Sequence, residues 1–274
     1  MALHHTVQAR VRRLGARGKP LIQRTLSTVG LTHSDRHLAS DAQLYWEDDG
    51  GSTWKGNSHW RDADVFSNEH ADLWAQLGRR HLDLFDRYSA MLDEPPRWGR
   101  VLEWGCGGGM NAVHFAPRAD EFVGVDVSTA SLDECGRQVA RVCETPYQPI
   151  LIHVDGPERV LRSVDGPCDI FLSFYVFELI PTPEYGERLL RIAFELLRPG
   201  GVALIQTKYD EGRFSTRPMR RDYNSRLADM TTYRISDFWQ LATACGFSPA
   251  ALNLEPHNEL DHRYAYYLLT KPAD

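Results

Sequence analysis

The chain has 274 residues, of which 42% are hydrophobic and 25% are charged, and its formal net charge at pH 7 is −6. A chain of this kind can bury one substantial core and an appended lobe, and it has no apolar run near the roughly 20 residues that span a bilayer. The negative charge disfavours nucleic acid as the main substrate, because nucleic-acid interfaces are basic.

The beginning of the chain is basic. Residues 1–34 contain six lysine and arginine side chains and no acidic side chain. Val7, Val11, Leu14 and Leu21 fall near one helical face, so the segment could contact a membrane surface or a partner protein. Its arginine-rich, acid-free composition is also similar to that of an organellar transit peptide. A solvated or loosely docked extension is the third interpretation, and the sequence leaves all three open.

An aromatic stretch follows at residues 45–60, where Trp46, Trp54 and Trp60 stand among polar residues and glycines. So many aromatic side chains are too apolar for an idle linker. They predict either packing of the extension against the rest of the protein or a lid over a bound ligand, and both can hold for different residues.

A long helix is expected from Ser67 to Met91, because apolar residues recur there at three- and four-residue spacing. Asp93-Glu94-Pro95-Pro96 ends it. We therefore divide the chain into an N-terminal region, residues 1–94, with the basic extension, the aromatic segment and this helix, and a main domain, residues 95–274.

Residues 101–109 read as a buried strand that runs into a glycine-rich loop. Gly105, Gly107 and Gly109 form an E-x-G-x-G-x-G pattern, and such loops bring backbone N–H groups against a ligand. The dinucleotide fingerprint G-x-G-x-x-G would need a glycine at Met110. The spacing therefore argues against a nicotinamide enzyme.

A second apolar strand, residues 122–126, ends in Asp126, whose carboxylate can accept hydrogen bonds from both hydroxyls of a ribose. Loop and acid together indicate a nucleoside ligand. Strand and helix patterns then alternate, which predicts an α/β fold with a mostly parallel sheet covered by helices on both faces. Further strands are expected at residues 150–154, from residue 169, and at 202–207, 250–254 and 264–270. Helices are expected after Ser128, with Val142 on the inward face, from Tyr185 to Leu197, and after a capping Ser236.

From Arg97 to Pro272 the chain resembles the class I S-adenosylmethionine-dependent methyltransferases of the small-molecule type. The glycine loop, Asp126, Asp155-Gly156 and Leu196–Gly201 follow one another in that family's order. The resemblance implies a doubly wound, seven-stranded Rossmann-like sheet whose last strand runs antiparallel between its two predecessors. It also implies S-adenosylmethionine as the cofactor.

In the resembled family the glycine loop holds the methionine half of the cofactor, the acid after the second strand holds the ribose, and the acid after the third strand recognises the adenine amino group. The cofactor-binding residues implied in this chain are Glu103, Gly105, Gly107, Asp126, Asp155, Gly156 and Ser173.

Methyl transfer from a sulfonium requires in-line alignment and exclusion of water, and a hydroxyl acceptor also requires a base. Many ubiquinone-type O-methyltransferases carry Glu-His after the fourth strand, whereas this chain has Glu178-Leu179. Glu178 is the catalytic candidate, although an acid here can simply orient the loop, and the sequence favours that role. Other candidate bases are Tyr175, His59, Asp210, His257 and His262.

Several chemistries are disfavoured. The fourth-strand loop, residues 173–176, lacks the Asn/Asp-Pro-Pro-aromatic motif of amino-methyltransferases that grip a flipped base or a glutamine amide. No metal site is expected, because Asp210-Glu211 alone supplies too few ligands. The five cysteines form no C-x-x-C pair, so we expect them to be reduced.

The long connector, residues 210–233, is rich in arginine and could be a lid or a clamp for a substrate anion.

The sequence therefore predicts a cytoplasmic S-adenosylmethionine-dependent methyltransferase for a small or medium-sized metabolite, with oxygen as the favoured acceptor. Nucleic acid is not expected as a partner, and contact of the basic start with a membrane surface stays open. Two alternatives also stay open: a non-catalytic cofactor-binding regulator, and a methyltransferase for protein or RNA.

Overall fold

The computed structural model describes residues 22–47, 52–67, 73–221, 223 and 227–273. The basic start with its apolar residues Val7, Val11, Leu14 and Leu21 lies outside the described residues, as do residues 68–72 of the expected helix from Ser67 to Met91.

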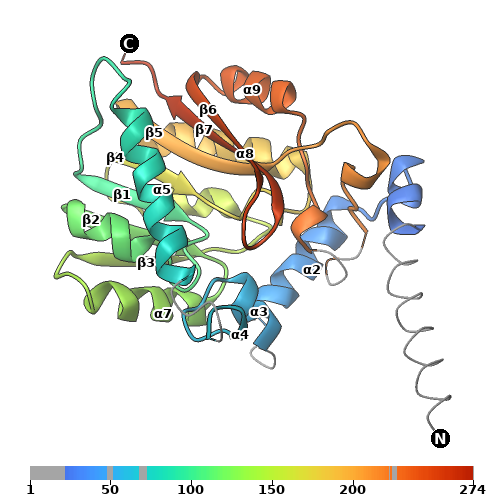
Figure 1. The fold of residues 1–274 in the computed structure, drawn as a ribbon, viewed down its shortest axis with the longest axis horizontal. Helices are drawn as coiled ribbons and strands as arrows, with labels where there is room; N and C mark the ends of the chain where they lie inside the picture. Colours follow the sequence, from blue (N-terminus) through green and yellow to red (C-terminus); the bar gives the residue numbers. More distant parts are fainter. Residues whose placement is uncertain (1–21, 48–51, 68–72, 222, 224–226, 274) are drawn as a thin grey trace, which may run out of the picture.

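A seven-stranded sheet forms the centre of the molecule, with the strand order β3-β2-β1-β4-β5-β7-β6 (Figure 1). β7 pairs antiparallel with β5 and β6, and the pairings among β1 to β5 are parallel. This arrangement confirms the doubly wound α/β sheet and the antiparallel last strand. The strands are β1 (Arg100–Trp104), β2 (Glu121–Asp126), β3 (Tyr147–Leu151), β4 (Cys168–Ser173), β5 (Leu197–Lys208), β6 (Ser248–His257) and β7 (His262–Thr270).

Helices cover both faces of the sheet and bury two separate cores. The first core includes α5 (Leu73–Ser89), α6 (Ala112–Phe115) and α7 (Thr129–Ala140); the second includes α8 (Pro183–Leu196) and α9 (Ile235–Ala244). Alternate strand residues enter the two cores, as Val101 and Leu102 do, because side chains of a strand point to opposite faces in turn. In Figure 1, α5 crosses the near face and α8 lies behind the strands.

Shorter helices lie on the N-terminal side of α5, and none of the described helices is long and apolar enough to cross a membrane. Trp46 on α2 is buried in the second core, and Trp54 and Trp60 are buried in the first. The helical elements that precede α5 are residues 22–28, α2 (Asp35–Glu47), α3 (Ser52–Asn57) and α4 (Asp64–Ser67). The 3-10 turns are η1 (Ala116–Arg118), η2 (Pro157–Arg162), η3 (Phe214–Thr216) and η4 (Leu227–Asp229).

Ser128 caps α7 as expected, because its side chain accepts a hydrogen bond from the backbone N–H of Ser131. The expected cap at Ser236 is wrong. α9 begins at Ile235, so Ser236 lies within the first turn, and its hydroxyl donates to Asp237 instead. The inward place given to Val142 is also wrong, since α7 ends at Ala140 and Val142 is exposed.

The third strand lies earlier than expected. It runs over Tyr147–Leu151 rather than over residues 150–154 and contains Pro149. β3 is an edge strand, and an edge tolerates a proline that lacks the N–H group for a ladder hydrogen bond. The shift brings residues 152–154 beyond the end of the strand.

Candidate active site

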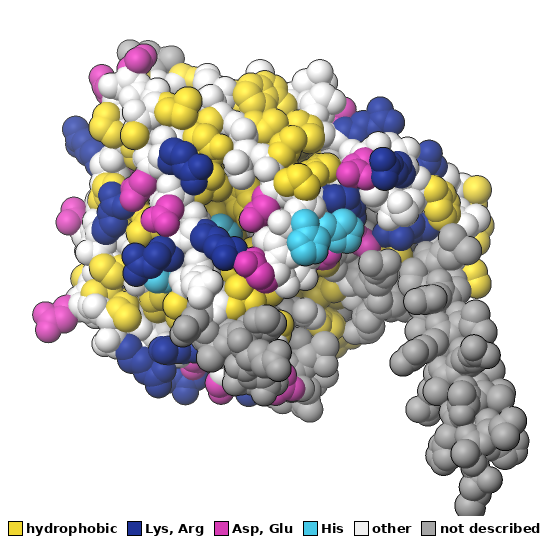
Figure 2. Space-filling model, viewed as in Figure 1, with side chains coloured by type: hydrophobic (Ala, Val, Ile, Leu, Met, Phe, Trp, Pro, Cys, Tyr) yellow, Lys and Arg dark blue, Asp and Glu magenta, His cyan; other side chains and the backbone are white. Residues whose placement is uncertain are grey.

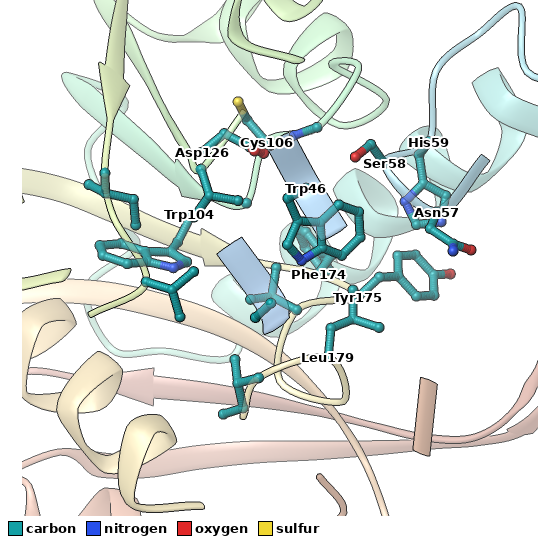
Figure 3. Close-up of a pocket in the computed structure, with 18 of the residues that line it drawn as sticks. Trp46, Asn57, Ser58, His59, Trp104, Cys106, Asp126, Phe174, Tyr175 and Leu179 are labelled. Atoms are coloured by element: carbon teal, nitrogen blue, oxygen red, sulfur yellow. Dashed lines mark hydrogen bonds between the residues drawn. The ribbon is translucent and has the colours of Figure 1, made fainter. Parts of the chain in front are cut away.

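A cavity lies where β1, β2 and β4 end, at the carboxyl edge of the parallel strands. This is the usual place for a ligand in such sheets. Figure 3 draws Trp46 at the centre of the close-up, with Trp104 on one side and His59 and Tyr175 on the other.

The glycine loop lines this cavity through Gly105 and Gly107, whose φ angles are +74° and +49°. Both angles are in the left-handed region that favours glycine. A Cβ on Gly105 would lie 2.3 Å from Cγ2 of Val176, and one on Gly107 would lie 2.3 Å from the carbonyl oxygen of Ser58. The loop is therefore free of side chains to admit its protein neighbours as well as a ligand.

Asp126 lies at the end of β2 and lines the same cavity. Its two carboxylate oxygens accept backbone hydrogen bonds from Gly107 at 2.9 Å and from Ser128 at 3.0 Å. Burial raises its pKa above the ordinary value. Each oxygen keeps further acceptor capacity. The carboxylate is therefore held in one orientation and can still receive two ribose hydroxyls, which fits the expected cofactor.

Other expected cofactor residues do not reach the cavity directly. Asp155 is exposed, and its carbonyl oxygen accepts from Arg188 rather than facing the cavity. Gly156 does not line the cavity either. Ile152 and Val154, which precede it, line the cavity instead. Ser173 is fully buried in β4, and its hydroxyl has no hydrogen-bond partner among the described residues.

Glu103 does not line the cavity but is linked to it through Asn111. Asn111 donates to its Oε1 at 2.6 Å, and the side-chain oxygen of Asn111 lies 2.7 Å from Nδ1 of His81. Asn111 itself lines the cavity. Burial raises the pKa of Glu103 to about 8 and lowers that of His81 to about 4, so both groups are largely uncharged at pH 7. The contacts with Glu103 and His81 therefore hold the side chain of Asn111 in place next to the glycine loop.

The aromatic segment supplies both packing and a roof. Nε1 of Trp46 donates to the hydroxyl of Tyr223 at 3.0 Å, and that hydroxyl donates to the carbonyl of Leu179 at 2.5 Å. All three residues line the cavity, so α2, the connector and the loop after β4 meet over it. Trp54 and Trp60 instead pack edge to face, 5.5 Å apart, within the first core.

A second cavity adjoins the first and shares Asn57, His59, Tyr175 and Leu179 with it. Glu178 lines this second cavity. Its side chain is 2% exposed, and among the described residues its Oε2 has no hydrogen-bond partner. Burial raises its pKa to about 7, while the nearby Lys208 ammonium acts in the opposite direction.

Tyr175 separates the two cavities and has a φ angle of +55°, which is rare for a bulky residue. Burial raises its pKa well above the ordinary value, so it is a hydrogen-bond donor rather than a base. Burial also lowers the pKa of His59 to about 3, with a further contribution from His81, and its ring lies 4.7 Å from that of Tyr175.

The remaining candidate bases line neither cavity. Asp210 accepts hydrogen bonds from Gly212 and Thr216 and lines a separate surface hollow. His257 is exposed, and His262 contacts Asp261 on the β6–β7 hairpin. Among the described residues, no group of three His, Cys, Asp or Glu side chains could hold a metal ion.

Sequence reasoning missed several residues that line the first cavity: Ser58, Trp104, Asn111 and Tyr185. Trp104 and Asn111 flank the glycines, so their place in the loop motif was a usable signal. Ser58 is brought there by a hydrogen bond from the Gly108 backbone N–H to its carbonyl oxygen, at 2.7 Å. No local pattern predicts such a contact.

A methyltransferase-domain family model matches residues 73–251, more than half of the chain. The chain is also similar to the ubiquinone biosynthesis O-methyltransferase of Psychrobacter arcticus, with 25% identity over 173 residues, which is 60% of this chain and 65% of that protein. With the tRNA 5-carboxymethoxyuridine methyltransferase of Escherichia coli it shares 27% identity over 132 residues, 48% of this chain and 45% of that protein. It thus spans less than two thirds of either relative.

Solved structures share the fold at low identity. The magnesium protoporphyrin IX methyltransferase of Synechocystis with bound S-adenosylmethionine has 13% identity and a TM-score of 0.58, over 87% of this chain and 98% of that one. The 1,6-didemethyltoxoflavin-N1-methyltransferase of Burkholderia thailandensis has 17% identity and a TM-score of 0.56, over 88% and 91%. S-adenosylmethionine is accordingly the cofactor of this chain, which belongs to the class I S-adenosylmethionine-dependent methyltransferases.

Proposed function

We propose that the protein transfers the methyl group of S-adenosylmethionine to a hydroxyl oxygen of a small or medium-sized metabolite. The observation that carries this proposal is Glu178, a buried carboxyl with a pKa of about 7 and an oxygen that has no hydrogen-bond partner among the described residues, on the wall of a cavity that adjoins the cofactor cavity. A base with a pKa near the operating pH is what a hydroxyl acceptor needs.

In this proposal the bound cofactor supplies an activated methyl group on a sulfonium. Asp126 receives the ribose hydroxyls, and the backbone of Gly105 and Gly107 lies against the methionine half. Trp46 and Tyr223 close the roof and exclude water. Glu178 takes the acceptor's proton, which replaces the orienting role that the sequence favoured for it.

Oxygen as the acceptor atom is supported by the likeness to ubiquinone biosynthesis O-methyltransferases. The tRNA relative supports a second candidate, an RNA acceptor. On the face drawn in Figure 2, however, basic and acidic side chains of the described residues are intermingled and form no continuous basic field. A small-molecule acceptor therefore suits this face better.

The test is incubation with methyl-labelled S-adenosylmethionine and an extract of the source organism, followed by separation by size. We expect the label in the low-molecular-mass fraction, and mass analysis of the product to give a methyl ether. Label in RNA or protein would contradict the small-molecule proposal. Binding of S-adenosylhomocysteine without transfer to any fraction would indicate a non-catalytic cofactor-binding protein.

A further inference from the structure

The second cavity has a distinctive distribution of charge. Its lining includes three acidic side chains, those of Asp64, Glu178 and Asp261. No lysine or arginine of the described chain lines it. His59 is its single histidine among the described residues, and it is neutral at pH 7 because burial lowers its pKa to about 3. The rest of the wall is apolar or aromatic, with Leu179, Leu227, Leu260 and Tyr264.

Buried cations lie close to the second cavity but do not line it. Lys208, 1% exposed, pairs with Asp261 and lies 3.5 Å from Asp229. Arg24 and Arg263 contact the two oxygens of Asp229 at 2.8 Å and 2.9 Å. The positive charge of Lys208 favours the ionised form of Glu178, while burial and Asp261 oppose it.

The acidic wall of the second cavity opposes an anionic acceptor. An anionic group in the cavity would contact acidic side chains, while the cations are buried and already paired. The wall therefore opposes a carboxylate or a phosphate, whereas Asp64 and Glu178 would not oppose a cationic group.

The charge changes of the proposed reaction cancel within the site. A neutral acceptor gives its hydroxyl proton to Glu178 and forms the O–C bond, while the C–S bond breaks and its electron pair stays on sulfur. The sulfonium loses its positive charge as Glu178 loses its negative charge, so the net charge of the site does not change. Glu178 then releases the proton to solvent.

From this geometry we propose that the second cavity binds a hydroxyl-bearing acceptor with an apolar part and rejects acceptors that carry a carboxylate or a phosphate group. This inference rests on the proposed function. It names Glu178, Asp261 and the neutral His59 as the groups that select the acceptor by charge.

The test separates a low-molecular-mass extract on anion and cation exchangers into anionic, cationic and unretained fractions before the incubation with labelled S-adenosylmethionine. We expect at least tenfold more label in the unretained and cationic fractions together than in the anionic fraction. Label mainly in acceptors that the anion exchanger retains would overturn the inference and leave the proposed function intact. No label in any fraction would overturn the proposed function itself.

A charge variant tests the wall directly. Val65 lines the cavity from α4 and is 44% exposed, so it can be replaced without burying a new charge. Val65→Lys should raise the ratio of labelled anionic to labelled unretained products about tenfold, whereas the matched control Val65→Gln should leave the ratio unchanged. An unchanged ratio in Val65→Lys, in protein that still binds S-adenosylhomocysteine, would show that wall charge does not select the acceptor.

Discussion

The two adjoining cavities are built in different ways. In the cofactor cavity the residues expected to bind the cofactor come from two short stretches, the glycine loop after β1 and the end of β2 at Asp126, and more distant segments complete the walls. The second cavity, which we propose for the acceptor, joins residues from α4, the loop after β4, η4 and the β6–β7 hairpin, with no such motif. A site made of contiguous residues keeps its chemistry in a short motif, whereas a site assembled from distant segments depends on tertiary packing. The predictions below test this contrast from the largest expected effect to the smallest.

The largest effect is expected at the acceptor cavity. Glu178→Gln keeps the size of the side chain and removes its basicity, and loss of a general base typically costs about 10²–10⁴ in rate. We expect a fall of that size in the single-turnover rate, with unchanged affinity for S-adenosylhomocysteine. The matched control is Asp210→Asn, an acid just after β5 that lines neither cavity. Equal losses in the two variants would argue against a specific role for Glu178.

At the cofactor cavity we expect a loss of affinity and not of the chemical step. Asp126→Ala removes a carboxylate that can accept two ribose hydroxyls, and hydrogen bonds to charged groups contribute about 1.5–3 kcal/mol. Affinity for S-adenosylhomocysteine, measured by calorimetry, should fall about 10- to 100-fold. Asp133→Ala, at an exposed position on α7, is the control and should bind normally. Unchanged affinity in Asp126→Ala would refute the ribose assignment.

The buried acid beneath the glycine loop should affect stability. The pKa of Glu103 is raised from 4.5 to about 8, so the folded state holds this proton more tightly than the unfolded state. Its contribution to stability is therefore lost as the pH rises from about 4.5 to about 8. Glu103→Gln should abolish this loss and be more stable than the natural protein at pH 9 by about 1 kcal/mol or more. Denaturant unfolding at pH 5 and pH 9 measures the free energy of unfolding of both proteins. If the difference between the two free energies were the same at both pH values, the buried-acid account would be contradicted.

The smallest effect is expected at the roof. Trp46→Phe removes the hydrogen bond to Tyr223, which contributes about 0.5–1.5 kcal/mol, so cofactor affinity should fall about two- to tenfold. The change in tryptophan fluorescence on binding should fall with it. In the control Trp60→Phe, whose ring packs in the first core, that change should persist. If Trp46→Phe kept both the cofactor affinity and the fluorescence change of the natural protein, Trp46 would not be part of the roof over the cofactor cavity.

The fold was largely predictable, because strand periodicity and the glycine pattern act locally. The alternating strands and helices and the place of Asp126 follow from short stretches of sequence, whereas the antiparallel β7 was implied by the resemblance to the methyltransferase family. Asp155 shows the limit: the order of the motifs placed it at the cofactor, but β3 begins early and leaves it exposed. The roof between Trp46 and Tyr223 joins residues 177 positions apart, which no spacing rule connects.

The role of Glu178 was the least predictable part of the site. The sequence shows an acid after β4 without the histidine of related enzymes, which favoured an orienting role. Its burial and the position of Lys208 depend on how β5 and the β6–β7 hairpin pack around it. A pKa is set by such surroundings and not by the identity of the residue alone.

The central claim is that Glu178 removes the acceptor's proton beside the cofactor cavity. The most direct measurement is the single-turnover rate across pH for the natural protein and Glu178→Gln, with the acceptor that the labelled extract identifies. Because only the ionised carboxylate accepts a proton, the natural rate should rise about tenfold per pH unit below a pKa of about 7 and level off above it. In Glu178→Gln this rise should disappear while cofactor affinity is kept. The same rise, with the same midpoint, in both proteins would contradict the claim.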